Sequence, residues 1–398
     1  MKPAGWLRLL AVTTLFAAAC GQVNPPTAKV TPSSTAVAGS DPSPAATSSP
    51  TPGATPRSTP KATPKPAPNS CPATAAASAP SNRNLALVSL SGSAGYVVRD
   101  ITDITHPKTV GNLGTAISVP AFVSGTEISY AGETGLVRVP LTGTPAKTWP
   151  TNPAFISYAF AWSPDGTTFV YLTTGASGMA LHQLTACKDR VVGGSMPGMP
   201  AVGCESQFCS GTDAWDFSLS YSPNGSYVSM VTSIANVSAF RIWAANGSVL
   251  KSSNSQSPSM SAWSGNGLYF LDAHGVEVWH AGVTSSVLPG VAWITPKASP
   301  GGGQIVYATR DAQGWHHTFV LDIATKQARE LKKGRSGPAF LTSRYIWYRG
   351  ERACVASDQC PPGWGAVPSG KTYIYDLLAG TETESVITQV YDVWPHPA

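Results

Sequence analysis

The sequence predicts an all-β fold, and three observations carry this prediction. First, seven stretches open with a short apolar run followed by a turn or by the end of the chain, and their marker residues lie 35 to 59 positions apart. The markers are Phe122, Trp162, Tyr221, Trp263, Ala298, Phe340 and Trp394. Second, each complete stretch continues into further short runs rich in Val, Ile, Tyr and Thr, which is typical of β-strands. Third, repeat periods of this size indicate a propeller or a solenoid.

Residues 1–19 are interpreted as an export signal. A cationic start precedes the apolar run Leu9–Ala19, which is too short to span a bilayer. Three alanines then lead into Cys20, which resembles a bacterial lipobox, although that motif prefers Leu where this chain has Ala17. The resemblance implies a diacylated Cys20 as the mature N-terminus, and the alternative is an ordinary signal peptide that releases a soluble protein. We expect an exported lipoprotein on the extracytoplasmic face of the cell membrane, which it contacts through this anchor only.

Residues 20–82 are predicted to form the anchor cysteine and a disordered tether. Twelve prolines occur between residues 25 and 68, mixed mainly with Thr, Ser and Ala, and no aromatic residue occurs between Phe16 and Tyr96. Such a segment cannot bury enough apolar surface to offset its ordering entropy. Its prolines favour extended polyproline II at roughly 3 Å per residue, which corresponds to a reach on the order of 100 Å.

Residues 83–398 are predicted to form a seven-bladed β-propeller. In each repeat the opening strand ends in a turn such as Pro164–Gly166, a second strand such as Thr168–Thr173 follows, and a third strand and a weaker fourth strand complete the unit. Four antiparallel strands make one propeller blade. Val390–Pro395 is an opening strand with nothing behind it, whereas Leu85–Gly114 supplies later strands without an opening one. Pairing of these two segments would complete the seventh blade and close the ring, which removes exposed sheet edges.

Two of the turns resemble a known family. Trp162–Gly166 reads W-S-P-D-G and Tyr221–Gly225 reads Y-S-P-N-G, and both are similar to the WD40-like repeats of TolB-type propellers. Val98–Lys108 is similar to the repeats of bacterial surface propellers. The resemblance is confined to single repeats, so it implies the fold and says very little about function.

The charge of the chain excludes one class of partner. Its formal net charge of +5 is carried entirely by residues 1–80, so residues 81–398 have equal numbers of positive and negative side chains. A nucleic-acid-binding domain should carry its basic excess on the folded part. We therefore expect no nucleic-acid partner.

Cysteine usage agrees with export. Six cysteines remain after Cys20, and an even number in an exported chain is typical of disulfides. The predicted pairs are Cys71–Cys187, Cys204–Cys209 and Cys354–Cys360. Because no CxxC pair or His-Cys cluster is present, we expect no metal site and no cofactor.

Catalytic patterns are weak. His316 and His317 are neighbours on one strand, so their side chains should point to opposite faces and cannot act together. Asp165 lies in a turn, where we expect it to accept hydrogen bonds from the backbone. No GxSxG elbow or HExxH helix is present, and we predict no catalytic residue.

Two long insertions are the best candidates for a binding surface. Gly194–Asp213 joins a fourth strand to the next first strand, and Gly350–Gly370 joins a second strand to a third strand. In propellers these two types of connection emerge on the same face, and long loops are often functional. The alternative is a decorated rim without a ligand. The candidate contacts are Trp215 and Trp364, with Arg349, Arg352, Glu205 and Asp358 as polar partners.

The sequence therefore favours a non-enzymatic, monomeric binding or scaffold module that recognises a protein or a glycan of the cell envelope. The alternative is an exported propeller enzyme, such as a lactonase, a glycan lyase or another hydrolase, with its site at the central channel. Histidines and carboxylates gathered at the channel mouth would distinguish the enzyme from the binding module.

Overall fold

The computed structural model describes the propeller and leaves out the predicted signal, Cys20 and the tether. The described residues are 83–92, 95–114, 118–132, 135–141, 146–152, 155–175, 178–196, 218–234, 237–253, 259–265, 267–358, 360 and 364–396. The chain divides into two units, Met1–Lys65 and Pro66–Ala398, and the propeller belongs to the second. In the described part of the chain no helix is long and apolar enough to cross a membrane.

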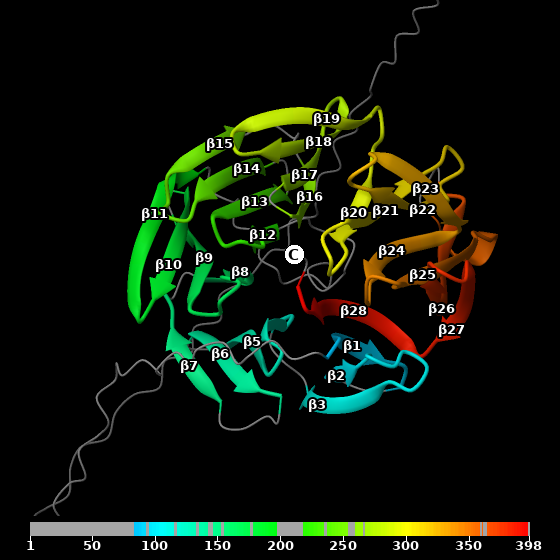
Figure 1. Cartoon of the computed structure of the whole chain (residues 1–398), viewed down its shortest axis with the longest axis horizontal. Helices are drawn as coiled ribbons and strands as arrows, with labels where there is room; N and C mark the ends of the chain where they lie inside the picture. Colours follow the sequence, from blue (N-terminus) through cyan, green and yellow to red (C-terminus); the bar gives the residue numbers. More distant parts are fainter. Residues whose placement is uncertain are drawn as a thin grey trace, which may run out of the picture. The chain divides into compact units, whose positions relative to one another are not determined.

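Seven antiparallel sheets of four strands form a ring, as the sequence predicts (Figure 1). We name the sheets blades A to G in chain order and give the strands of each from the centre outwards. Blade A contains β28 (Ile387–Trp394), β1 (Leu85–Leu90), β2 (Tyr96–Asp100) and β3 (Lys108–Gly114). Blade B contains β4 (Ala121–Ser124), β5 (Glu127–Gly132), β6 (Gly135–Pro140) and β7 (Lys147–Pro150). Blade C contains β8 (Phe155–Trp162), β9 (Thr168–Gly175), β10 (Gly178–Thr185) and β11 (Lys188–Met196).

The remaining four blades follow the same order. Blade D contains β12 (Ser218–Tyr221), β13 (Tyr227–Ile234), β14 (Val237–Ala244) and β15 (Val249–Ser253). Blade E contains β16 (Ser259–Ser264), β17 (Gly267–Asp272), β18 (Gly275–His280) and β19 (Val283–Pro289). Blade F contains β20 (Ile294–Ala298), β21 (Gln304–Arg310), β22 (His316–Asp322) and β23 (Gln327–Lys333). Blade G contains β24 (Arg335–Phe340), β25 (Tyr345–Ala353), β26 (Ala366–Asp376) and β27 (Thr381–Ser385), with the short 3-10 helix η2 (Ala356–Asp358) before β26.

The seven marker residues of the sequence repeat all lie on the innermost strands of their blades, namely β4, β8, β12, β16, β20, β24 and β28. The predicted closure is also confirmed, because β28 pairs with β1 in antiparallel register and Trp394 lies opposite Leu85. Blade A is thus assembled from the first and last strands of the propeller, which lie 299 residues apart at Ser89 and Thr388.

Large side chains of the inner strands pack between blades, and two of them make the same polar contact. The indole N–H of Trp162 donates to Ser129 Oγ of the preceding blade at 2.7 Å. Trp263 donates to Ser229 Oγ of its preceding blade at 2.8 Å. Both serines are fully buried, and Ser229 Oγ also lies 3.1 Å from Ser220 Oγ of its own blade, so each indole bonds a hydroxyl that is shielded from water.

A buried cation joins blades B and C. The Arg138 side chain is 2% exposed, and its guanidinium lies 5.6 and 5.0 Å from the ring centroids of Trp149 and Trp162. Its guanidinium pairs with Glu127 and donates to the Gly166 carbonyl at 2.8 Å. Because that carbonyl belongs to the W-S-P-D-G turn, Arg138 fixes the turn of one blade to the body of the blade before it.

Aspartates at the ends of third strands have a structural role. Asp100, Asp322 and Asp376 each accept backbone N–H bonds from the turn that follows, at 3.1, 2.8 and 2.9 Å for the first donor. Asp165 likewise accepts the Thr167 N–H in its turn at 3.1 Å.

Candidate binding surface on blades F and G

The predicted insertion Gly350–Gly370 begins as an extension of the sheet of blade G. β25 and β26 continue their pairing into it, with Arg352 opposite Val367 and Ala353 opposite Ala366. The insertion therefore projects as a two-stranded ribbon, and only its tip is a loop.

The tip is held by a disulfide and an ion pair. Cys354 and Cys360 are joined, as predicted, with their Cα atoms 6.4 Å apart. Arg352 donates two parallel bonds to Asp358, at 2.6 and 2.7 Å, and the Val355 N–H donates a third at 2.8 Å. The bond from Arg352 lowers the pKa of Asp358 to about 2. Arg352 and Asp358, both predicted to contact a partner, are thus bound to each other.

The same tip brings two sulfur atoms and a carboxylate together. The Sγ atoms of Cys354 and Cys360 and a carboxylate oxygen of Asp358 lie within 4.8 Å of one another. Sulfurs that form a disulfide are not thiolates and do not serve as zinc ligands. We therefore interpret this cluster as a structural disulfide that closes the loop, with a carboxylate beside it.

The base of the ribbon is bound to blade F. Glu351 of β25 is 4% exposed and pairs with the His316 ring of β22, whose backbone N–H donates to the same carboxylate at 3.0 Å. Burial alone would raise the pKa of Glu351, but the bonds from His316 lower it below its usual value. The backbone N–H of Glu351 also donates to the Gly334 carbonyl at 3.0 Å. This carboxylate fixes the ribbon to the neighbouring blade.

The ribbon presents Trp364 beside the β21–β22 loop of blade F. The Arg310 guanidinium lies 4.0 Å from the centroid of the Trp364 ring, and 41% of Trp364 is exposed. The backbone beside Trp364 can lie directly against the β21–β22 loop because residue 365 is glycine. A Cβ there would lie 2.0 Å from the Gln313 carbonyl oxygen. Arg310 forms no ion pair within 4.0 Å with any described residue, although its charge helps to lower the pKa of Glu351.

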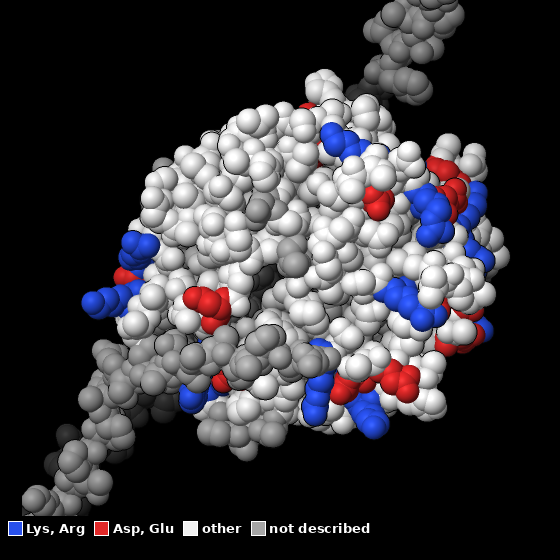
Figure 2. All heavy atoms as spheres, in the orientation of Figure 1, with Lys and Arg blue, Asp and Glu red and all other residues white. Residues whose placement is uncertain are grey.

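Further charged groups continue the surface on blade F. Asp311 accepts bonds from Lys333 at 2.7 Å and from His317 at 3.1 Å, and His317 also contacts Glu330 at 2.8 Å. Lys333 lies 6.0 Å from the Trp315 ring centroid. We call Arg310, Trp315, Lys333 and Trp364 the F–G surface. Figure 2 shows charged side chains over the region of β22–β27 and β1–β3, a smaller group over β7–β11, and far fewer over β12–β17.

The other predicted contacts are distributed differently. Arg349 lies on β25 before the ribbon begins, and it donates to Gln389 of β28 at 2.9 Å, toward blade A. Trp215 and Glu205 lie outside the described residues, as do Cys71, Cys204 and Cys209. Cys187 is disulfide-bonded and sits in the two-residue turn between β10 and β11, where it and Ala186 have φ of 61° and 46°.

Sequence reasoning missed the contribution of blade F. Arg310 and Trp315 lie at the two ends of the connection between β21 and β22. This joins the second strand of a blade to the third, as the predicted insertion does in blade G. An aromatic residue in that short loop and an arginine at the end of the strand before it were the available signal. The histidines behave as predicted, since His316 and His317 point to different partners on opposite faces of β22.

No family model and no curated protein matches the sequence. Among solved structures, the chain is similar to an oligogalacturonate lyase from Vibrio parahaemolyticus, with a TM-score of 0.50 and 8% identity over 77% of this chain and 85% of that one. It is similar to a structure from a study of two prolyl endopeptidases, with a TM-score of 0.50 and 12% identity over 78% of this chain and 49% of that one. It is also similar to TolB from Acinetobacter baumannii, with a TM-score of 0.44 and 14% identity over 79% and 67%.

At these identities the similarity shows the propeller fold alone. The seven-bladed ring agrees with the repeat-level resemblance in the sequence. Because proteins with different functions share this fold, the function of this chain has to be argued from its own surface residues.

Proposed function

We propose that this protein is a lipid-anchored, extracytoplasmic propeller that binds a protein or a glycan of the cell envelope through the F–G surface. The observation that carries the proposal is the exposed Trp364 ring, stacked with Arg310 at the tip of a ribbon that is held in place. The disulfide, the Arg352–Asp358 pair and the Glu351–His316 pair all restrict this ribbon before any partner arrives. Preorganisation of this kind reduces the entropy lost on binding.

The residue types on the surface support binding. Tryptophan and arginine dominate binding hot spots, where truncation typically costs about 2 kcal/mol or more. A tryptophan ring can stack on the apolar face of a sugar or pack into a protein groove, and the Arg310 charge can pair with a carboxylate of either partner. The carboxylates Asp311, Glu351 and Asp358 are already paired within the protein.

The test measures binding of the full chain to immobilised envelope fractions, with the glycan and protein fractions kept separate. Replacing Trp364 with alanine should weaken binding to one fraction at least tenfold, with the melting temperature unchanged. The matched control is Leu378→Ala in the β26–β27 turn of the same blade, where Leu378 is 79% exposed. A loss from variants of the Asp165–Gly166 turn, with none at Trp364, would place the binding site elsewhere on the ring.

The anchor is tested separately. Mass spectrometry of protein extracted from membranes should find a diacylglyceryl group on Cys20, and Cys20→Ser should release the protein from the membrane fraction. A soluble mature chain that begins at Cys20 with a free thiol would contradict the anchor and leave the binding surface intact.

A further inference from the structure

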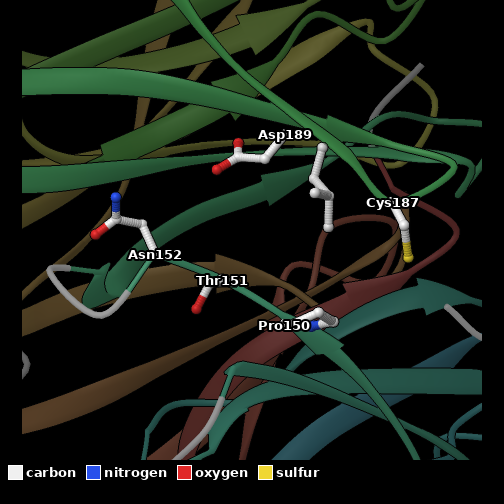
Figure 3. A pocket seen from close by; sticks show the side chains of 6 residues that line it. Pro150, Thr151, Asn152, Cys187 and Asp189 are labelled. Atoms are coloured by element: carbon white, nitrogen blue, oxygen red, sulfur yellow. The ribbon is translucent and has the colours of Figure 1, made fainter. Parts of the chain in front are cut away.

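A cavity of about 350 Å³ lies in the seam between blades B and C, away from the F–G surface. It is lined by Pro150, Thr151, Asn152, Leu184, Cys187 and Asp189 (Figure 3). Its volume is within the range of small-ligand sites, which combine apolar walls with a few oriented polar groups.

The polar centre of this cavity is the Asp189 carboxylate. It accepts a bond from the Tyr171 hydroxyl at 2.7 Å and contacts His182 Nδ1 at 3.1 Å, yet 34% of its side chain remains exposed. Tyr171 is fully buried and stacks on the His182 ring with centroids 4.9 Å apart. Burial strongly raises the pKa of Tyr171, which keeps its hydroxyl a donor. Two buried side chains therefore fix the direction of a carboxylate that stays open to the cavity.

The network also connects the two blades. The backbone N–H of Asn152, on the chain leaving β7, donates to the Tyr171 hydroxyl at 3.1 Å. This bond places the Asn152 side chain and the Thr151 hydroxyl at the wall of the cavity, on the side that Asp189 faces in Figure 3. The walls contributed by Pro150 and Leu184 are apolar.

The charge of the lining selects the ligand. Among the described residues that line the cavity there is no lysine or arginine, and the neighbouring Arg190 donates to Gln183 at 2.9 Å. A carboxylate without a full cationic partner repels anions and attracts cations. An ammonium group offers three donors and no acceptor, which suits a wall of carboxylate, amide and hydroxyl oxygens.

We infer that this cavity binds an alkylammonium group, with the charge at Asp189 and the methylene groups against Pro150 and Leu184. A lysine side chain of a protein partner and a free aliphatic amine both have this chemistry. The site is distinct from the F–G surface and does not depend on it.

The experiment uses the full chain and three probes: n-butylammonium, Nα-acetyl-lysine N-methylamide, and the same lysine derivative acetylated on Nε. Calorimetry or NMR titration should show saturable binding of the first two at roughly millimolar concentration and none of the third. Lysine binding at least tenfold tighter than butylammonium binding would identify a protein side chain as the source. Equal affinities would identify a free amine.

Two variants test the role of the carboxylate. Asp189→Asn keeps the shape of the side chain and removes the charge, so it should weaken binding of both amines at least tenfold. The control is Asp165→Asn in the same blade, which should bind normally. Its fold should be intact, because Asn224 already occupies the matching turn position in blade D.

Thr151→Val provides a second variant that leaves the contacts of Asp189 with Tyr171 and His182 in place. It should weaken binding about threefold while thermal melting is unchanged. Equal binding of the Nε-acetylated probe would overturn the inference. So would unchanged affinity in Asp189→Asn, or saturable binding of a neutral monosaccharide in place of the amines.

Discussion

The backbone N–H of Phe122 donates to the Asp392 carboxylate at 2.7 Å, although the two residues are 270 positions apart. Asp392 lies on β28 of blade A, and Phe122 lies on β4 of blade B. The closing strand is therefore bound to β1 by its ladder and to the next blade by a charged acceptor. Such a charge-assisted bond is stronger than one between neutral groups.

Replacing Asp392 with alanine should leave the Phe122 N–H without its acceptor and lower the free energy of unfolding by about 1–3 kcal/mol. Urea denaturation followed by tryptophan fluorescence measures this change. Asp272→Ala is the control, because that carboxylate accepts a bond from its neighbour Ala273 in an exposed turn. Equal stability of the two variants would show that Asp392 does not help to hold the ring closed.

Deleting residues 388–398 should have a larger effect. The deletion removes almost all of β28, so β1 becomes an unpaired edge and the buried side chains Leu85 and Leu87 lose their cover. Unpaired apolar edges promote aggregation. Size-exclusion chromatography should show aggregates. A monomeric truncated protein with unchanged cooperative melting would contradict the closure.

The repeated indole–serine bond predicts a coupling between blades. Trp162→Phe and Ser129→Ala should each lower the free energy of unfolding by about 1 kcal/mol or more, since each leaves a buried polar group or its partner unsatisfied. In a double-mutant cycle the two changes should not add, because both remove the same bond. Trp364→Phe, at an exposed ring, serves as the control and should leave stability unchanged.

His317 predicts a pH dependence of stability. Burial opposes its protonation, but the bonds that its ring donates to Asp311 and Glu330 raise the pKa of His317 above its usual 6.5. A raised folded pKa means that the contribution of this ion pair is complete below the unfolded pKa and is lost as the pH rises through the folded value. Wild type should therefore be more stable than His317→Gln at pH 6, and the difference should shrink by pH 9. A difference that grows with pH would exclude this ion pair as its cause.

The remaining disulfides stay predictions that peptide mapping can decide. Cys187 is disulfide-bonded in its β10–β11 turn, and we expect Cys71 as its partner. The loop closed by this bond would run from Cys71 to Cys187, and a disulfide that closes so long a loop would stabilise the fold by nearly 5 kcal/mol in the chain-entropy model. We expect the third pair to be Cys204–Cys209. A peptide that links Cys187 to Cys204 under non-reducing conditions would overturn both assignments.

The architecture could be predicted because each blade repeats a local pattern. Trp162 and Tyr221 mark inner strands through their position before an S-P-D-G or S-P-N-G turn, and such a pattern depends on neighbouring residues only. The closure by Val390–Pro395 followed from counting strands. This C-terminal segment is a first strand without the second to fourth strands of a blade, and the N-terminal segment has those strands but no first strand, so the two complete one blade. Both inferences use order along the chain and need no contact between distant side chains.

The site could be predicted only in part, because it depends on contacts between blades. The insertion and its disulfide are visible in the sequence, but nothing local indicates that Arg310 of blade F stacks on Trp364 of blade G. Likewise, Arg352 and Asp358 were expected to face a partner. The short disulfide-closed loop brings them close enough to bind each other instead. Asp189 and the two side chains that contact it, Tyr171 and His182, come from three strands, and strand alternation does not reveal that they converge.

The pairing of β28 with β1 also determines the order in which the protein can fold. β1 is the first strand of the propeller to be synthesised and β28 is the last. Leu85 and Leu87 on β1 therefore cannot pack against β28 until the whole ring has been synthesised. Contacts between residues so far apart in sequence form slowly, and an exposed apolar strand can aggregate meanwhile. Newly made chains of this protein should therefore depend on a holding chaperone, and slowing synthesis near the last blade should lower the yield of folded rings.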